Sequence, residues 1–148
     1  MVDSMQFKTA SLMVKLGNAV TYYRNLKMQD MDLTSVQSDV IIAALRTPGI
    51  TASQLKEELQ LSQSTVAGII ARLDQKGLIT KTTDSADARK GILNLTPQGQ
   101  ALEEGLKQIA LKTQQALVEG MSEAEQEEFS RLLQIALDNM NRFRLHKE

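Results

Sequence analysis

The residues best suited to specific chemistry lie in one run, residues 61–80, which reads LSQSTVAGIIARLDQKGLIT. Its apolar side chains recur at i, i+3, i+4 and i+7, the spacing of one helix face; they are Val66, Ile69, Ile70 and Leu73. The opposite side carries Ser64, Ala67, Gly68 and Ala71, where a solvated helix normally carries long polar side chains. A glycine inside a helix costs about 1 kcal/mol relative to alanine. A side this small therefore indicates that something comes close to the helix backbone.

Hydroxyl and amide groups at the start of this helix suit the recognition of DNA, because a recognition helix lies in the major groove with its N-terminal residues nearest the base edges. Gln63 can form a bidentate pair with adenine, and the methyl groups of Thr65 or Ala67 can contact thymine. Arg72, farther along the helix, is better placed for a phosphate. The candidate contact residues are Ser62, Gln63, Ser64, Thr65, Ala67, Gly68 and Arg72. The alternative is that Ala67, Gly68 and Ala71 pack tightly against another helix.

Capping signals make this helix the second of a helix-turn-helix. Thr51 and Gln54 have the pattern of a capping box, in which hydroxyl and amide groups satisfy free backbone groups, and they predict a short helix over 52–59. Ser62 is the expected N-cap of the next helix, which Gly77 ends. Two short helices joined by a tight turn are typical of a helix-turn-helix.

A hairpin is expected directly after this helix pair. The β-prone runs LITKTT and ILNLT flank an eight-residue polar loop, DSADARKG. Arg89 and Lys90 lie near the tip of that loop, and such a wing can lay an arginine into the minor groove of DNA. A solvated charged turn is the commoner role of such a loop, but its position after a helix-turn-helix favours DNA contact.

The remaining helices flank this region. Capping signals at Thr34 with Gln37, at Thr96 with Pro97 and at Ser122 with Glu125 predict helices that run to about Arg46, from 97 to about Glu119, and over 123–143. Apolar spacing predicts another helix over 5–28. The long helices carry more apolar surface than a small lobe can cover, so we expect them to pack against a partner subunit, although they could fold back on their own core. The expected fold is mostly α with a small β-hairpin wing: a single domain over 1–148, a winged helix-turn-helix DNA-binding lobe over 32–96, and dimerisation helices at 5–28 and 97–143.

Composition excludes several classes of function. The 148-residue chain has no cysteine and one histidine, His146, which excludes disulfides, thiol catalysis, cysteine zinc sites and a Ser-His-Asp triad. Carboxylate pairs such as Glu57 and Glu58 are neighbours in sequence and do not face each other on a helix. We therefore expect no enzyme, no metal and no cofactor. There is no run of 18 apolar residues and no signal peptide, so a cytoplasmic protein without membrane contact is expected.

The charge distribution leaves a second function open. The net charge is −1, but residues 62–92 carry five Lys or Arg against three Asp, whereas residues 97–148 carry six against nine Asp or Glu. So small an excess of positive charge would form a DNA-binding surface only if the basic residues cluster on one face of the protein. The alternative is a winged-helix module that binds a protein partner without sequence-specific DNA recognition.

These patterns together resemble the MarR family of bacterial regulators. The resemblance covers residues 5 to 143 and rests on LTSVQSDVIIAAL, TASQLKEELQLSQSTVAGIIARLDQKGLI and DSADARKGILNLTPQG. Family members typically carry Asp-Arg-Arg in the wing and then Leu-Thr-x-x-Gly, and this chain matches at Asp87, Arg89, Leu95, Thr96 and Gly99. Ala88 departs from the pattern, and Lys90 can replace the missing cation. The resemblance assigns minor-groove insertion to Arg89, with Asp87 orienting it.

The resemblance also implies partners. It implies a homodimer, formed by the first and last two helices, on a roughly palindromic double-stranded operator with half-sites about 10 bp apart. It implies repression of a nearby gene or of the protein's own gene, relieved in many members by a small, often aromatic ligand. Met13, Tyr22, Tyr23 and Arg46 could line a cleft for such an effector, although Met and Tyr at helical spacing are more often plain core.

Overall fold

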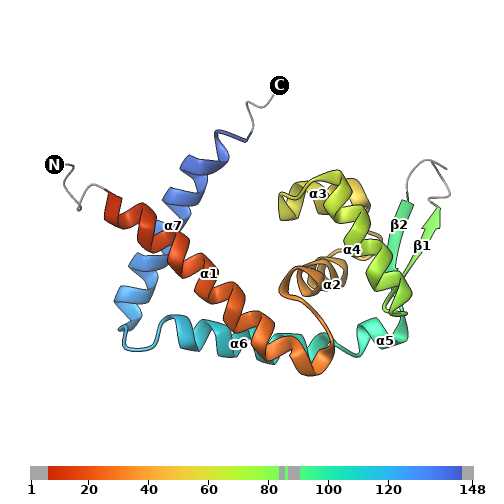
Figure 1. Ribbon diagram of the computed structural model, residues 1–148, viewed down its shortest axis with the longest axis horizontal. Helices are drawn as coiled ribbons and strands as arrows, with labels where there is room; N and C mark the ends of the chain where they lie inside the picture. The colour runs from red at the N-terminus through yellow and green to blue at the C-terminus, as the bar shows by residue number, and fades with distance from the viewer. Residues whose placement is uncertain (1–6, 84–85, 87–90, 145–148) are drawn as a thin grey trace. The chain divides into compact units, whose positions relative to one another are not determined.

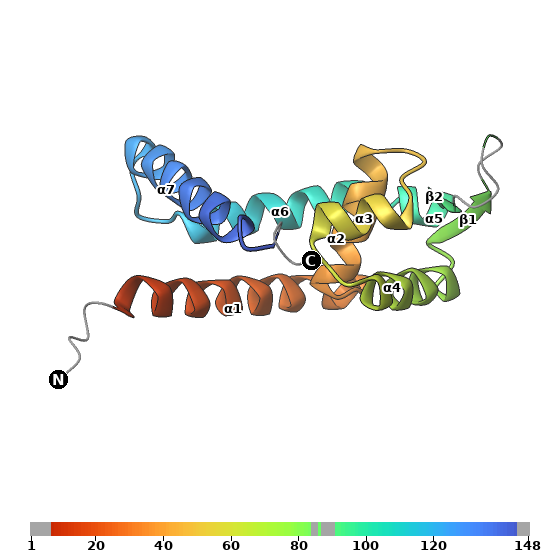
Figure 2. The same ribbon diagram turned by 90° about the horizontal axis from the view of Figure 1, so that it is seen from above.

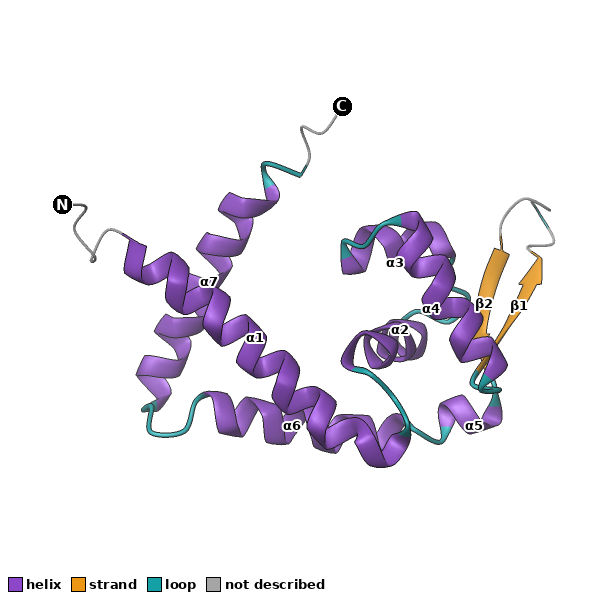
Figure 3. Ribbon diagram, viewed as in Figure 1, coloured by secondary structure: helices purple, strands orange, loops and turns teal. Residues whose placement is uncertain are grey.

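The computed structural model describes residues 7–83, 86 and 91–144. They divide into two compact units, residues 1–113 and residues 114–148. Helices predominate, and the strands form a two-stranded antiparallel sheet (Figure 3). The expected fold class, mostly helical with a β-hairpin, is confirmed. Within the described residues, no helix is both long and apolar enough to cross a membrane.

The first unit is built around three helices and the hairpin, which lie together at one end of the unit (Figure 1). The helices are α2 (Ser35–Arg46), α3 (Ala52–Leu59) and α4 (Gln63–Gln75), and the strands are β1 (Ile79–Thr83) and β2 (Gly91–Leu95). The capping boxes that open α2 and α3 form as predicted, with Thr34 and Thr51 accepting from backbone N–H groups and Gln37 and Gln54 returning the bond. Local sequence signals thus fix where the helices begin.

The core of this unit joins the helix pair to the hairpin. Each element contributes aliphatic side chains that are at most 1 % exposed; they are Val40, Ile41, Ile50, Leu55, Val66, Ile70, Leu73, Ile79 and Leu93. Burying one such side chain contributes roughly 1.5–3 kcal/mol. Because α4 supplies three of them, its orientation is fixed by the core and its outer side is free for another role.

The hairpin is anchored to the helices by an additional backbone connection. β1 pairs with β2 in the register Ile79 with Leu95 and Thr83 with Gly91. The Leu93 N–H also donates to the Ile50 carbonyl at 2.9 Å, and Thr51 forms an isolated bridge with Ile92. The segment between α2 and α3 therefore adds a short third strand position, which the sequence did not predict.

The helix predicted from residue 97 to about Glu119 is two helices. α5 (Pro97–Gln100) is followed by a turn at residues 101–102 and then by α6 (Glu103–Leu117). The predicted N-cap and N1 proline are present, since the Thr96 hydroxyl accepts from the Gly99 N–H at 3.1 Å. At the turn, the Leu102 N–H bonds to the Gly99 carbonyl three residues back, in place of the bond four residues back that an α-helix requires. The single long helix was therefore wrong.

The cause of this break is the way the chain leaves the hairpin. The Thr96 N–H donates to the Leu78 carbonyl at 3.0 Å, and the Thr96 hydroxyl donates to the Gly77 carbonyl at 2.6 Å. Gly99 lies so close to the Leu78 carbonyl that a Cβ there would overlap its oxygen. The pattern Leu-Thr-x-x-Gly is thus a structural joint between hairpin and helix.

The first helix, α1 (Lys8–Met28), leads through a 3-10 turn (Gln29–Met31) into α2. Helix α1 was predicted over 5–28; residues 5 and 6 lie outside the described residues. The Arg24 guanidinium donates to the Asp39 carboxylate at 2.5 Å and to the Ser35 carbonyl at 3.3 Å. The Ser35 N–H donates to the Asn25 side chain at 2.7 Å. These contacts join the end of α1 to the first turns of α2.

The second unit contains α7 (Glu123–Asn141), which ends two residues before its predicted end. Its predicted capping box is present: the Ser122 N–H donates to the Glu125 carboxylate at 3.0 Å, and the Glu125 N–H donates to the Ser122 hydroxyl at 3.2 Å. Both bonds lower the pKa of Glu125. The bond from the Ser122 backbone has the larger effect, and the bond with the Ser122 side chain has the smaller one. None of the residues of α7 is buried.

Candidate nucleic-acid interface

The turn between α3 and α4 is tight because Gln60 adopts a left-handed conformation with φ 54°. The N–H groups of Gln60 and Leu61 both donate to the Lys56 carbonyl, so the end of α3 is closed by its own chain. Ser62 then caps α4, its hydroxyl accepting from the Thr65 N–H at 3.2 Å. The two predicted helices therefore form a helix-turn-helix, with α4 in the second position.

Three hydroxyl groups meet at the exposed start of α4. The Ser62 hydroxyl donates to the Thr65 hydroxyl at 2.7 Å and lies 3.2 Å from the Ser64 hydroxyl. All three residues, and Gln63 beside them, are exposed. Hydroxyl groups can rotate to donate or accept, so this cluster can bond either phosphate oxygens or base edges.

The outer side of α4 is free of packing within the described residues. Ala67, Gly68 and Ala71 are exposed, and a Cβ built on Gly68 would meet no atom within 4 Å. The inner side, by contrast, is buried through Val66, Ile69, Ile70 and Leu73. Within the described part of the first unit, the small residues thus do not pack against another helix, and they leave the α4 backbone open to a bulky partner.

Cationic side chains flank this small outer side. On one side, a hollow of about 340 Å³ between α3, α4 and β1 is lined by Lys56, Lys81, Gln63 and Ala67 among others. On the other side, Arg72 lines a hollow of about 550 Å³ with residues from the start of α2 and with Lys76. The Lys76 ammonium is already bonded to the Asp32 carbonyl and to the Gln37 amide oxygen, whereas Arg72 is exposed.

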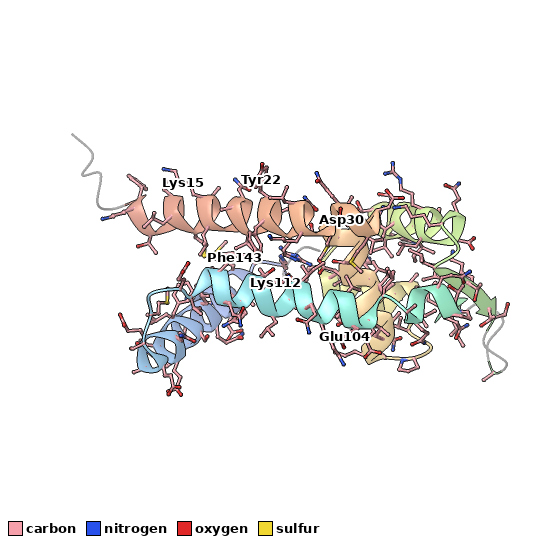
Figure 4. The ribbon with its side chains drawn as sticks, turned by 90° about the horizontal axis from the view of Figure 1, so that it is seen from below. Lys15, Tyr22, Asp30, Glu104, Lys112 and Phe143 are labelled. Carbon is pink, nitrogen blue, oxygen red and sulfur yellow. The ribbon has the colours of Figure 1, made fainter. Side chains whose placement is uncertain are left out.

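The remaining predicted site residues are more scattered. Asp87, Arg89 and Lys90, the predicted wing contacts, lie outside the described residues. Tyr22 is 72 % exposed and projects from α1 on the same side as Lys15 (Figure 4).

The other predicted cleft residues have different surroundings. Met13 is exposed, and the Lys27 ammonium lies 5.3 Å from the centre of the Tyr23 ring. Arg46 lines a hollow of about 250 Å³ between α2 and α6 and lies 3.7 Å from the Glu58 carboxylate. That hollow is lined by Arg46 together with Ile42, Leu45, Glu103, Leu106, Lys107 and Ala110.

This architecture can be set beside known proteins. A family model described as MarR family matches residues 31–90. The transcriptional regulator HosA of Escherichia coli is 30 % identical over 102 residues, which are 69 % of this chain and 76 % of HosA. The chain belongs to the MarR family. It is therefore a DNA-binding transcriptional regulator and not an enzyme.

Two solved structures support this assignment of a MarR-family regulator. The Staphylococcus aureus MepR–DNA complex matches with a TM-score of 0.82 and 26 % identity, over 93 % of this chain and 99 % of that one. BpsR of Bordetella bronchiseptica, whose DNA binding is regulated by 6-hydroxynicotinic acid, matches with a TM-score of 0.80 and 27 % identity. That match covers 87 % of this chain and 92 % of BpsR.

Sequence reasoning missed two lysines of this regulator, Lys56 and Lys81. They come from α3 and β1, 25 positions apart in the sequence, and only the packing of both elements on α4 brings them to one hollow. A partial signal was present, because Lys56 lies one helical turn after Ala52, which lines the same hollow. Nothing local ties Lys81 to that position.

Proposed function

We propose that this MarR-family regulator is a repressor that binds a pseudo-palindromic operator as a homodimer, with α4 in the major groove. The exposed small side of α4 carries the proposal, because it combines a close approach to the backbone with a hydroxyl cluster at the helix N-terminus. The residues proposed to contact DNA are Ser62, Gln63, Ser64, Thr65, Ala67, Gly68 and Arg72. Of these, Gln63 is proposed to read a base and Arg72 to bind a phosphate.

The wing completes the proposed interface. Asp87, Arg89 and Lys90 come after β1 and before β2 in the sequence, in the part of the loop that lies outside the described residues. Arg89 is proposed to enter the minor groove and Lys90 to supply the cation that Ala88 lacks. The region over 32–96 would then be the DNA-binding lobe and would act on DNA in the cytoplasm. MepR, a relative of similar fold, is solved as a complex with DNA.

Exposed apolar side chains on the terminal helices support the homodimer. On α1, Leu12 and Val14 are 54 % and 64 % exposed. On α7, Leu132 and Met140 are 50 % and 65 % exposed. Large apolar side chains exposed on the terminal helices favour a contact with another protein, which would remove them from water. We propose that residues 5–28 and 97–143 form the dimer, which would hold two copies of α4 at the spacing of two half-sites.

A small aromatic effector is proposed to bind the hollow between α2 and α6. Its lining combines the aliphatic side chains of Ile42, Leu45 and Leu106 with the cations of Arg46 and Lys107. Glu103 also lines the hollow, and its carboxylate lies 3.4 Å from the Lys107 ammonium. Such a lining suits an aromatic acid, with the ring against the aliphatic side chains and the carboxylate near Arg46. The relative BpsR is regulated by a ligand of that chemistry, 6-hydroxynicotinic acid. A contribution from Met13, Tyr22 and Tyr23 stays a prediction.

The test of the proposed function is a titration of DNA from upstream of the protein's own gene, followed by fluorescence anisotropy at several salt concentrations. We expect preference over a scrambled duplex and an affinity that falls steeply with salt, because bound phosphates release counterions. Equal, weak binding to this duplex, to a scrambled duplex and to genomic fragments selected for binding would contradict the proposal. It would favour a winged-helix module with a protein partner.

A further inference from the structure

Lys56 and Lys81 line a hollow that, among the described residues, has cations and no carboxylate in its lining. The lining residues are Ala52, Ser53, Lys56, Gln63, Val66, Ala67, Ile70 and Lys81. Among the described residues, neither lysine ammonium has an ion-pair or hydrogen-bond partner. Two exposed, unneutralised ammonium groups at one hollow favour an anion.

The charge on α3 is divided between its two sides. Glu57 and Glu58 line a separate hollow with Thr47 and Ile50, on the side away from α4, and Glu58 pairs with Arg46 at 3.7 Å. The side that faces α4 and β1 therefore keeps the positive charge of Lys56. This division explains how a protein with a net charge of −1 can present a cationic surface beside α4.

Arg72 provides a cation on the opposite side of the same helix. It lines a hollow that shares no residue with the hollow of Lys56 and Lys81. Asp32 also lines the hollow of Arg72, and its carboxylate lies 3.7 Å from the Lys76 ammonium. The exposed strip of Ala67, Gly68 and Ala71 runs between the two hollows. Figure 2 shows α3, α4 and the hairpin that carry these groups.

The dimensions of DNA connect these observations. The major groove is about 12 Å wide and is bounded by the phosphates of both strands, and a helix with its side chains is about 10–12 Å across. A helix that enters by its small strip must present its two flanks to opposite walls of the groove. Cations on both flanks can then each meet one strand.

We propose that Lys56 and Lys81 bind backbone phosphates of one DNA strand while Arg72 binds the other, so that α4 is clamped between two rows of phosphates. This inference rests on the proposed function. It adds two residues to the interface and assigns them a sequence-independent role, since phosphate contacts fix register and orientation but do not read bases.

The experiment is the salt dependence of operator binding for Lys56→Gln, Lys81→Gln and the double variant. Each phosphate contact contributes about 0.9 to the slope of log K against log salt per protein subunit. We expect the double variant to lower that slope by about 2 per subunit and to weaken binding roughly tenfold per lysine at 0.1 M salt. The loss should be equal on operator and scrambled duplexes.

Matched controls keep the outcomes separate. Lys15→Gln with Lys112→Gln removes the same charge from α1 and α6, and we expect it to leave the slope near that of the unmodified protein. Lys56→Arg with Lys81→Arg should retain the slope, which shows that charge and not lysine packing is measured. The unmodified protein and the Gln double variant could bind the operator with equally steep slopes of log K against log salt. That result would overturn this inference while the proposed function stands. If the unmodified protein does not bind DNA, the proposed function fails first.

Discussion

Helices α4 and α7 both carry apolar residues at helical spacing, but α4 buries these residues whereas α7 leaves them exposed. In α4, Val66, Ile70 and Leu73 are at most 1 % exposed, and the outward residues are small or polar. In α7, no residue is buried, and Leu132 and Ile135 are 50 % and 46 % exposed. The apolar side chains of α4 pack within its own unit, whereas α7 presents large apolar side chains at its surface.

This contrast separates two kinds of partner. Small side chains and hydroxyl groups leave a backbone accessible to a polar, charged ligand such as DNA. Large aliphatic side chains gain stability only by leaving water, at about 25 cal/mol per Å² buried, so they require an apolar partner. The two helices therefore divide the proposed function between operator recognition and dimerisation.

The largest effect is expected on α7. Leu132→Lys with Ile135→Lys places charges on the apolar side, and we expect the dimer to dissociate because unpaired charges are costly to bury. Operator affinity should fall by at least about 100-fold, since the two half-sites would no longer be bound as a linked pair. Sedimentation velocity and anisotropy measure the two effects. If the double variant remains a dimer with unchanged operator affinity, α7 is not part of the dimer interface. Glu127→Lys, on the polar side of α7, is the control.

Substitution of two glycines, Gly99 at a packed position and Gly68 at an open one, should change stability in opposite directions. Gly99→Ala should destabilise the fold by about 1–3 kcal/mol, because its Cβ would press on the Leu78 carbonyl and a packed site resists added volume. Urea unfolding measures the change. The matched control is Gly68→Ala on the open side of α4, which should raise stability by up to about 1 kcal/mol through helix propensity and weaken operator binding. Loss of stability at Gly68 would show that the strip is packed after all.

A smaller effect is expected at a single base contact. Gln63→Ala should lower operator affinity by about 1–3 kcal/mol and relax specificity at one base pair, if the amide pairs with adenine. Binding to a set of operators with single substitutions measures both quantities. A uniform loss over all sequences would instead assign Gln63 to a phosphate.

The smallest effect is expected from the cap of α7. Because the pKa of Glu125 is lowered in the folded state by the bonds from Ser122, this group stabilises the fold above its unfolded pKa of about 4.3 and loses that contribution as the pH falls through the folded value. An NMR titration of the Glu125 carboxyl should show the lowered pKa. Glu125→Gln keeps the acceptor and should flatten the dependence of stability on pH in this acid range. An unshifted titration would contradict the capping geometry.

Much of the fold could be predicted because its signals are local. Capping boxes at Thr34, Thr51 and Ser122 mark helix starts within four residues, and alternation of apolar residues marks the hairpin. The break between α5 and α6 could not be predicted, because it depends on the contact of Gly99 with Leu78, 21 positions away. The bond between Leu93 and Ile50 was missed for the same reason.

The candidate site divides in the same way. The exposure of Ser62 through Thr65 and the open side of α4 followed from helical spacing alone. The flanking positions of Lys56 and Lys81 required the packing of α3 and β1 on α4, which no window of sequence contains. Local patterns thus identified the part of the surface that lies on one helix, and tertiary packing determined its charged borders.

The most direct test of the division between α4 and α7 uses the absence of cysteine from the chain. Ser64→Cys and Leu132→Cys each introduce a single thiol, and the rate of its alkylation is measured with and without an operator duplex. We predict that the operator slows alkylation at position 64 and leaves the rate at position 132 unchanged. Protection at position 132 with none at position 64 would contradict the claim that α4 contacts DNA and α7 contacts a second copy of the chain.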